Sequence, residues 1–512
     1  MEPKKEKAEL PTIFKLVSYY QEEWNNSKKI LEELKSFFID EKNSLEEKFQ
    51  RLSDTIKTFQ NLHRKDSFSM KFIKDDGKIN CVSLNEAIKS YYKTNEKDFY
   101  TKVLPFIIDQ ALLLEERAKE KYNEQTLPLM TTGKAMKVSI PKLLFLSIIS
   151  NNFFCNHKDL DNQITKEQQL ENEYPFNEVD WYSLYIHSIS KYVTVHIERI
   201  ICFLAFFDFA YKIITEKKNN YFEKDIIVER LVFDFEEIAK TLSKCENTFE
   251  ESDVNIHIKD MDNPGIKTQS LVNFANRNFQ TGQIIPSATQ EEVLFCVRPE
   301  LYAAMMICQR VNVNEIVVVS NTYKIMENEG YLQSFKFTKL KENFFSEDLT
   351  SSYDNDNENI LCLDATFSYH YSPKSVAQDI SKFYSACNYC SKKYENPGIS
   401  TGSWGCGAFG CDKAHKFLQQ LICAKANKVK LSFSTFGKEK YAKDLERLIK
   451  NVIKNKPRVC DLYKLIVDFD GNDDEKFHDY LKKHLGEKFD IDKDVMPMYS
   501  FLGGIQTLVG EA

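Results

Sequence analysis

Four glycines lie within nine positions of this chain, in the segment Gly402-Ser-Trp-Gly-Cys-Gly-Ala-Phe-Gly410. The whole chain of 512 residues contains only 16 glycines, so ordinary turns do not explain this concentration. Glycine tolerates positive φ and lets a ligand approach the main chain closely. Converging backbone N–H groups bind phosphate oxygens. We therefore expect a diphosphate-binding loop, with a tight turn that serves only the fold as the alternative.

A second feature is the pair of adjacent carboxyl groups on Glu291 and Glu292, which precede the apolar stretch Val293-Leu-Phe-Cys-Val297. Splitting a glycosidic bond requires an acid that protonates the leaving oxygen and a base that activates water. Burial and mutual repulsion raise the pKa of one group of such a pair, which then stays protonated near neutral pH. The alternative is structural, because the helix dipole also favours glutamate in a first turn.

Together these motifs resemble the catalytic core of the poly(ADP-ribose) glycohydrolases. The family pattern reads V-D-F-A-N, a triple-glycine loop, Q-E-E, and later G-N-W-G-C-G-A-F-G. The matching segments here are Val272-Asn-Phe-Ala-Asn276, Phe279-Gln-Thr-Gly282, Gln290-Glu-Glu292 and Gly402 to Gly410. Weaker similarity extends the match over most of the chain. The resemblance implies a macrodomain-like fold that hydrolyses ribose–ribose O-glycosidic bonds of poly(ADP-ribose) and releases ADP-ribose.

The resemblance also implies roles for individual residues. Glu292 matches the residue that acts first as general acid and then as base, and Glu291 matches the neighbour that orients the ribose. Tyr331 matches a tyrosine that closes over the terminal ADP-ribose, and Phe436 matches a phenylalanine that stacks on the adenine. The substrate-binding positions are Asn276, Gly282, Gln290, Tyr331, Ser403, Trp404, Gly405, Cys406, Gly407, Ala408, Phe409 and Phe436. Neither a metal nor a cofactor is implied.

Four positions depart from the family pattern. Asn273 stands where the family has an aspartate of the catalytic group, Ser403 stands where an asparagine is usual, and Gln280 and Thr281 replace two glycines. A side chain forced into a glycine conformation costs on the order of 1 kcal/mol or more. Two hypotheses follow: an active glycohydrolase, or a weakened or inactive relative that binds ADP-ribose or serves as a structural subunit.

Composition restricts the ligand and the compartment. The net charge of −7 argues against bulk electrostatic binding to DNA, so we expect poly(ADP-ribose) or ADP-ribose to be held by loop N–H groups and local residues such as Arg277. The 13 scattered cysteines and the charged N-terminus indicate an intracellular protein, nuclear or cytoplasmic and not secreted. Cys387 and Cys390 are expected to face inward from one helix, and the apolar run 201–207 to be core, not a membrane span.

Residues 1–110 are expected to form a charged helical extension with one long amphipathic helix over 27–62. This helix packs back on the chain by default, and binding to a protein partner as a coiled coil is the alternative. Residues 111–250 are expected to form a helical accessory layer. From residue 251 to 512, short β-branched strands such as 315–320 alternate with helices such as 412–426. This alternation predicts a three-layer α/β sandwich, which the resemblance sharpens to a macrodomain-like core with a mixed central sheet.

Overall fold

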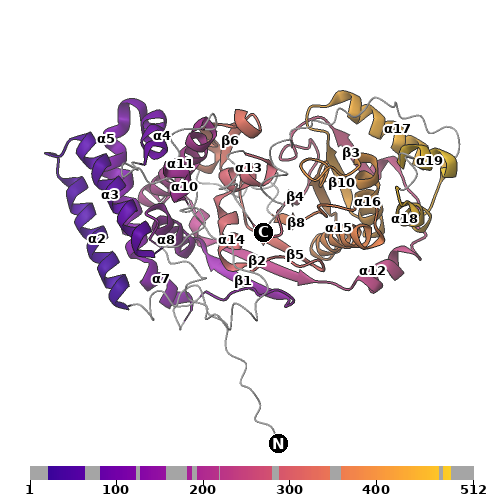
Figure 1. Ribbon diagram of the computed structural model, residues 1–512, viewed down its shortest axis with the longest axis horizontal. Helices are drawn as coiled ribbons and strands as arrows, with labels where there is room; N and C mark the ends of the chain where they lie inside the picture. Colours follow the sequence, from indigo (N-terminus) through magenta and orange to yellow (C-terminus); the bar gives the residue numbers. More distant parts are fainter. Residues whose placement is uncertain are drawn as a thin grey trace, which may run out of the picture. The chain divides into compact units, whose positions relative to one another are not determined.

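The computed structural model of the chain consists of two compact units, drawn in Figure 1. The first contains the chain up to Asp234 and Gln269–Ala365, and the second contains Phe235–Thr268 and the chain from Thr366 onward. The structure describes residues 21–63, 81–122, 127–156, 181–186, 193–217, 219–279, 288–345, 359–471 and 477–485. The predicted divisions near residues 110 and 250 stay predictions.

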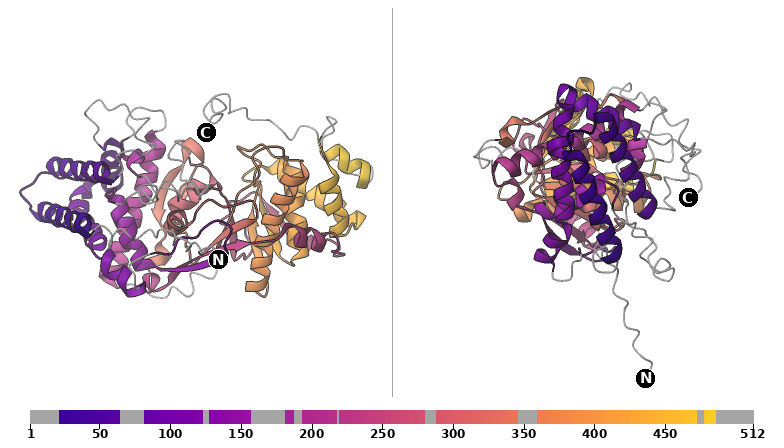
Figure 2. Two further views of the ribbon diagram at one scale, coloured as in Figure 1. Left: turned by 60° about the horizontal axis from the view of Figure 1, so that its bottom comes forward. Right: turned by 90° about the vertical axis from the view of Figure 1, so that its left-hand side faces the viewer.

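The first unit begins with a helical hairpin, not with one long helix. Helix α2 (Gln21–Ile39) and helix α3 (Leu45–His63) lie side by side, which the left view of Figure 2 shows in indigo. The prediction of a single helix over residues 27–62 was therefore wrong. The turn is fixed by a capping box, in which the Ser44 N–H donates to the Glu47 carboxylate at 2.8 Å and the Glu47 N–H donates to the Ser44 hydroxyl at 3.2 Å.

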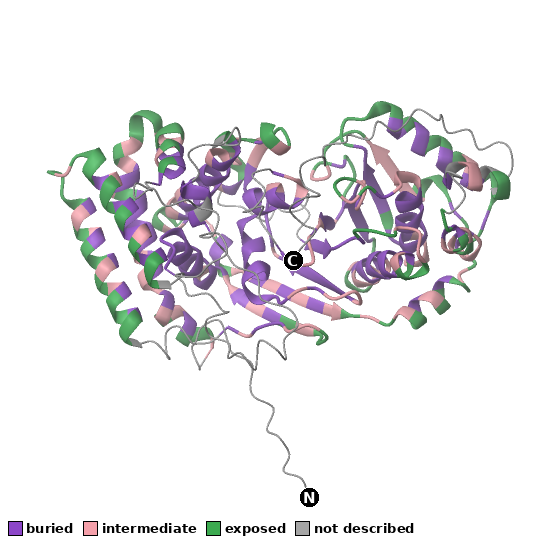
Figure 3. Cartoon of the chain, in the orientation of Figure 1, coloured by how far each residue is buried: buried purple, intermediate pink, exposed green. Residues whose placement is uncertain are grey.

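The apolar stripe of the hairpin is buried within the first unit. Leu34 and Phe38 of α2 and Leu52 and Ile56 of α3 have no exposed surface, and α2 packs on α6 (Leu104–Leu112). Figure 3 shows the resulting alternation of buried and exposed positions along both helices. Intramolecular packing, the default expectation, thus accounts for the stripe.

The remaining helices of this unit include a long apolar helix, α11 (Val193–Glu216), which packs against α4 (Val82–Tyr92) and α10 (Tyr182–Ile186). Others are α5 (Glu96–Asp98), α7 (Leu114–Lys121) and α8 (Lys142–Phe153). Residues 201–207 lie in α11 and are mostly buried, which confirms that this apolar run belongs to the core. Among the helices that the structure describes, none is long and apolar enough to cross a membrane.

In the described part of the first unit, five neighbouring strands lie in the mixed sheet in the order β1 (Met136–Pro141), β2 (Asp225–Val232), β5 (Glu315–Ser320), β8 (Asn359–Leu363) and β4 (Ser270–Phe274). The first three pairings are antiparallel, and β4 pairs with β8 in parallel. Strands β5 and β8 are buried along their whole length, as their β-branched and apolar sequences favour. Two short helices, α13 (Gln290–Val297) and α14 (Tyr302–Ile307), pack on this sheet, and β6 (Met326–Glu329) pairs with β7 (Lys336–Leu340).

The second unit contains three parallel strands in the order β9 (Gly398–Thr401), β10 (Lys430–Ser434) and β3 (Val254–His257). Helices α15 (Pro373–Lys393), α16 (Lys413–Ala426) and α17 (Glu439–Asn455) pack against them. The unit is completed by α12 (Phe235–Leu242), α18 (Val459–Asp468) and α19 (Phe477–Leu485).

Most predicted elements of the α/β part are confirmed. Strand β5 has the predicted bounds, and α16 begins directly after Asp412, whose side chain accepts the N–H of His415 at 2.8 Å. Cys387 and Cys390 are both buried on α15, as expected for inward-facing thiols. Parallel and antiparallel strands, helices against them and a helical N-terminal part together confirm a mixed α/β fold with a mixed central sheet.

Candidate active site

The start of helix α13 is fastened to the end of strand β4 by the side chain of Gln290. Its amide oxygen accepts the N–H of Phe274 at 2.8 Å, and its amide nitrogen donates to the carbonyl of Val272 at 2.9 Å. The Gln290 side chain therefore makes the two hydrogen bonds that a neighbouring strand would make to the Phe274 N–H and the Val272 carbonyl. This fixes the first turn of α13, which carries both glutamates, relative to the asparagines at the end of β4.

Glu291 is held from two sides by residues of the β4 segment. One carboxylate oxygen accepts the main-chain N–H of Asn276 at 3.0 Å, and the other lies 3.4 Å from the side-chain nitrogen of Asn273. Its side chain is only 5% exposed. Burial, and secondly the charge of Glu292, raise the pKa of Glu291 well above its usual range, although both asparagine hydrogen bonds oppose this shift. Within the pair, Glu291 is therefore the carboxyl whose pKa the surroundings raise.

Asn273 occupies a fully buried position on β4, beside the carboxyl pair. Its nitrogen also points at the thiol sulfur of Cys362 on β8, at 3.6 Å. Its side-chain oxygen has no hydrogen-bond partner among the described residues. A buried polar atom without a partner costs stability, so this amide is a strained feature of the site.

Glu292 is held by Thr289, the residue that precedes α13. The Thr289 N–H donates to one carboxylate oxygen, Oε2, at 2.7 Å, and the Thr289 hydroxyl donates to the same oxygen. The two residues form a capping box, since the hydroxyl also accepts the N–H of Glu292. Within the described part of the chain, the other oxygen, Oε1, has no hydrogen-bond partner. The T-x-x-E pattern from Thr289 to Glu292 is the sequence signal for this box.

Tyr331 reaches the same carboxyl pair from a tight turn before β7. Gly330 has φ of +73°, and a β-carbon there would collide with the main chain of Ser334, so glycine is required. The turn is tied to the start of α13 by the Leu332 N–H, which donates to the carbonyl of Ala288 at 2.9 Å. Burial, and secondly the charge of Glu292, raise the pKa of the Tyr331 phenol. The side chain remains 37% exposed, as a residue that closes over a ligand requires.

The loop that corresponds to the family's triple glycine lies mostly outside the described residues. Gln280, Thr281 and Gly282 lie outside the described residues. Arg277, the expected positive feature beside this loop, is 34% exposed in its side chain and lies 3.5 Å from the carboxylate of Asp364. Its charge is therefore partly balanced by a buried acid.

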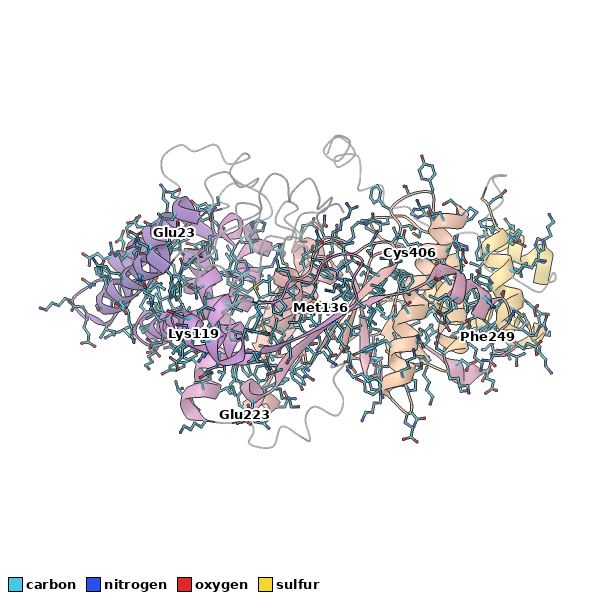
Figure 4. All side chains as sticks on the ribbon, turned by 90° about the horizontal axis from the view of Figure 1, so that it is seen from below. Glu23, Lys119, Met136, Glu223, Phe249 and Cys406 are labelled. Atoms are coloured by element: carbon cyan, nitrogen blue, oxygen red, sulfur yellow. The ribbon has the colours of Figure 1, made fainter. Side chains whose placement is uncertain are left out.

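The glycine-rich segment 402–410 forms a compact loop in the second unit, between β9 and α16. The Cys411 N–H donates to the carbonyl of Gly405 at 3.1 Å, and the Gly410 N–H donates to the carbonyl of Gly407 at 3.1 Å. Gly405 and Gly410 have φ of +74° and +73°, which explains glycine at both positions. Figure 4 marks the loop with its label at Cys406.

Gly407 is different, because the fold gives no reason for a glycine there. It is not among the glycines with positive φ, and a β-carbon at this position would meet no atom within 4 Å. Gly407 and its neighbour Ala408 are exposed. A glycine that neither the backbone conformation nor the packing requires indicates close approach by another molecule.

The other predicted residues of this loop differ in exposure. Trp404 is 1% exposed, and the Lys416 ammonium lies 4.4 Å from its ring centre, so its side chain supports the loop from the interior. The Cys406 thiol donates to the carbonyl of Trp404 at 3.5 Å, and burial raises its pKa well above its usual range. Ser403 and Phe409 are half-buried.

Phe436 lines a shallow pocket at the end of β10. Its side chain is 52% exposed and its φ is +52°, a conformation that costs energy for a residue with a β-carbon. The other lining residues are Ile258, Lys259, Asp260, Asn263 and Gly437. An aromatic face beside a carboxylate suits a base that stacks and donates a hydrogen bond. Asp260 was not assigned from sequence, because its position beside Phe436 depends on the pairing of β3 with β10.

Two protein-family models match the chain. Residues 91–230 match the model described as "Poly (ADP-ribose) glycohydrolase (PARG), helical domain", and residues 239–443 match "Poly (ADP-ribose) glycohydrolase (PARG), Macro domain fold". The second match includes both carboxyl groups, the glycine loop and Phe436.

Curated relatives bear related names. The chain is 24% identical over 207 residues to "Poly(ADP-ribose) glycohydrolase 1" of Caenorhabditis elegans; this match covers 38% of this chain and 26% of that protein. It is 26% identical over 211 residues to "Poly(ADP-ribose) glycohydrolase 2" of the same organism, which covers 38% of this chain and 43% of that protein. It is 21% identical over 442 residues to "Probable poly(ADP-ribose) glycohydrolase 2" of Arabidopsis thaliana, which covers 74% of this chain and 80% of that protein. The chain thus spans less than half the length of both nematode relatives.

The raised pKa of Glu291 predicts a pH-dependent stability. Because its pKa is higher in the folded than in the unfolded protein, whose value is near 4.5, the stability it contributes is full below pH 4.5 and is lost as pH rises. The loss is up to about 1.4 kcal/mol per pH unit over this window. Glu291→Gln removes the titrating group. As pH rises, the free energy of unfolding of the unmutated protein should therefore fall relative to that of the variant.

Denaturant unfolding at about pH 5 and about pH 8 measures this difference. The exposed residue Glu395 supplies the control variant, Glu395→Gln, whose stability should follow that of the unmutated protein. If Glu291→Gln and the unmutated protein lose stability in parallel, the pKa of Glu291 is not raised.

Proposed function

Because this chain belongs to the poly(ADP-ribose) glycohydrolase family, we propose that it hydrolyses the ribose–ribose O-glycosidic bonds of poly(ADP-ribose) and releases ADP-ribose. One observation carries the proposal. Glu291 and Glu292 are both buried at the start of α13, yet they are held by different partners, Glu291 by the Asn276 N–H and Glu292 by the Thr289 N–H. A first turn that serves only the fold does not need two buried acids.

The proposed chemistry begins with Glu292. In its protonated form, Glu292 gives its proton to the ribose oxygen that leaves, while positive charge develops on the anomeric carbon of the other ribose. The resulting carboxylate then removes a proton from water as that water attacks the anomeric carbon. Thr289 occupies Oε2, so Oε1 is the oxygen that exchanges the proton.

Glu291 is proposed to stay protonated and to hydrogen-bond the ribose. Two neighbouring buried carboxylates repel each other, so a neutral Glu291 leaves the pair with a single negative charge when Glu292 is ionised. In this account the neutral side chain of Asn273 is compatible with catalysis, because it adds no third negative charge. Asn276 and Gln290 frame the ribose, since their contacts fix the position of the pair.

In the second unit, the loop around Gly405 and Gly407 is proposed to bind the diphosphate through main-chain N–H groups. Phe436 is proposed to stack on the adenine, with Asp260 as the acceptor beside it. Tyr331 is proposed to cover the ribose next to Glu292.

Three further proposals concern the compartment, a second candidate function and a protein partner. All thirteen cysteines are free thiols, which supports action inside the cell, in the nucleus or the cytoplasm. The second candidate function is an ADP-ribose-binding relative without turnover. The buried side-chain oxygen of Asn273, which has no partner among the described residues, favours this second function, because Asn273 lies beside the carboxyl pair. Binding of a protein partner through α2 and α3 is a weaker proposal, since their apolar stripe is already buried.

Purified protein incubated with poly(ADP-ribose) should release ADP-ribose, which chromatography detects. Glu292→Gln keeps the shape of the side chain but cannot act as acid or base, so we expect a fall in kcat of about 10³-fold or more. The variant should still bind ADP-ribose. Absence of turnover by the unmutated protein, together with retained ADP-ribose binding, would select the second candidate function.

Thr289 supplies a test of how Glu292 is held. Thr289→Val removes the hydroxyl that donates to Oε2 but keeps the shape and the main-chain N–H. Hydrogen bonds to a charged group contribute about 1.5–3 kcal/mol, so kcat should fall about tenfold or more while KM for polymer changes little. Thr289→Ser should restore kcat. Equal kcat in the valine variant and the unmutated protein would show that the hydroxyl does not position the catalytic carboxyl.

Gly407 tests the proposed diphosphate loop. Gly407→Ala introduces a β-carbon that meets no protein atom within 4 Å, so the free energy of unfolding should change by less than about 1 kcal/mol. If a diphosphate approaches the main chain there, the Kd for ADP-ribose should rise about tenfold or more, as calorimetry measures. Gly133→Ala is the matched control, because φ of +81° predicts lost stability without lost affinity. Unchanged affinity in Gly407→Ala would remove this loop from the binding site.

A further inference from the structure

Two aromatic side chains of the second unit project into solvent beside the glycine loop. Phe367 is 65% exposed and Tyr369 is 83% exposed, although burial of such side chains is normally favourable. The ring of Phe367 meets the ring of Phe409, a residue of the glycine loop, edge to face at 5.3 Å between centres. We call Phe367 and Tyr369 the aromatic patch. The patch is thus continuous with the loop proposed to bind the diphosphate.

The turn that carries the patch is anchored at both ends. At its start, the Thr366 N–H and hydroxyl both donate to the buried carboxylate of Asp379, at 3.0 and 2.8 Å, and Asp379 pairs with Lys416. At its end, Ser372 caps helix α15, and its N–H donates to the carbonyl of Tyr369 at 2.9 Å. Exposure of the two rings is therefore a property of a fixed turn.

His370 ties this turn directly to the glycine loop. Its Nδ1 lies 3.1 Å from the sulfur of Cys411, and its ring also hydrogen-bonds the main chain of Phe409. Tyr369, next to it, has φ of +52°, which disfavours a residue with a β-carbon. A strained residue whose large side chain is displayed to solvent, on a turn fixed to a binding loop, indicates a ligand contact.

We propose that the aromatic patch stacks on adenine bases of the polymer beyond the ADP-ribose unit that is cleaved. This inference rests on the proposed function and extends it to the length of the substrate. Each unit of poly(ADP-ribose) carries one adenine, and a flat base stacks on exposed aromatic rings in single-stranded nucleic acids. Lys374, exposed in the first turn of α15, follows this turn in the chain and supplies a positive charge, which suits the phosphates of the same units.

The chemistry distinguishes this ligand from an apolar protein surface. The patch consists of two rings on one turn and is flanked by a lysine and by the glycine loop, so it offers π faces and positive charge but little continuous apolar area. Stacking on a base depends on the ring faces, whereas contact with an aliphatic surface depends on area alone. Replacement by leucine separates the two, because leucine keeps apolar area and has no π face.

The experiment measures binding in the Glu292→Gln background, where polymer is not consumed. Fluorescence anisotropy compares the Kd for a polymer of several units with the Kd for ADP-ribose, before and after Phe367→Leu and Tyr369→Leu are introduced together. Loss of base stacking should weaken polymer binding on the order of tenfold and leave ADP-ribose binding unchanged. Replacement of both residues by tryptophan should restore polymer affinity, because tryptophan keeps a stacking face.

Other outcomes contradict the proposal. Equal polymer affinity with and without the leucine replacements means that the patch does not contact the polymer. An equal loss of affinity for polymer and for ADP-ribose means that the replacements disturb the glycine loop instead. Because both arms measure binding, the result stands even if the unmutated protein shows no turnover. Absence of turnover by the unmutated protein would contradict the proposed hydrolase activity. The binding measurements would still decide whether the patch recognises polymer.

Discussion

Two neighbouring carboxyl groups occupy the first turn of one buried helix, and the arrangement around them follows from the cost of placing charge there. Both cannot be ionised cheaply in a site that water hardly reaches. The surrounding chain divides its donors accordingly. Asn273 and Asn276 face Glu291, whereas Thr289 faces Glu292. Each carboxyl meets its own donors only if α13 has a fixed position relative to β4. The two hydrogen bonds of the Gln290 side chain to the β4 main chain fix that position.

The departures from the family pattern differ in their physical consequences. At Asn273, an aspartate would add a third acid to a buried pair, so the amide removes charge at the cost of one oxygen without a described partner. The glycine loop of the second unit retains Gly407, whose backbone and surroundings would accept a side chain. Selection of a glycine without an internal need for it is explained by a ligand that must come close to the main chain.

Local patterns in the sequence predicted the elements well where one signal dominated. Strand β5 has a β-branched centre from Ile316 to Val319, and its bounds are those predicted. The prediction of one long N-terminal helix was wrong because it followed the apolar stripe, which continues across the turn that the Ser44 capping box fixes. Burial of Trp404 under the glycine loop and the place of Asp260 beside Phe436 depend on long-range packing, which periodicity does not encode. Family resemblance identified the carboxyl pair, whereas the hydrogen-bond partners of each carboxyl depend on how β4 and α13 meet in the fold.

A crystal structure of the protein with ADP-ribose bound tests the central claim most directly. The account predicts that Oε1 of Glu292 lies within hydrogen-bond distance of a group on the anomeric carbon of the ribose, with Oε2 still held by Thr289 and with the diphosphate beside the segment that contains Gln280. A Glu292 carboxyl turned away from the ribose, or a Gln280 side chain in the place of the diphosphate, would contradict hydrolysis and leave only the shared ancestry.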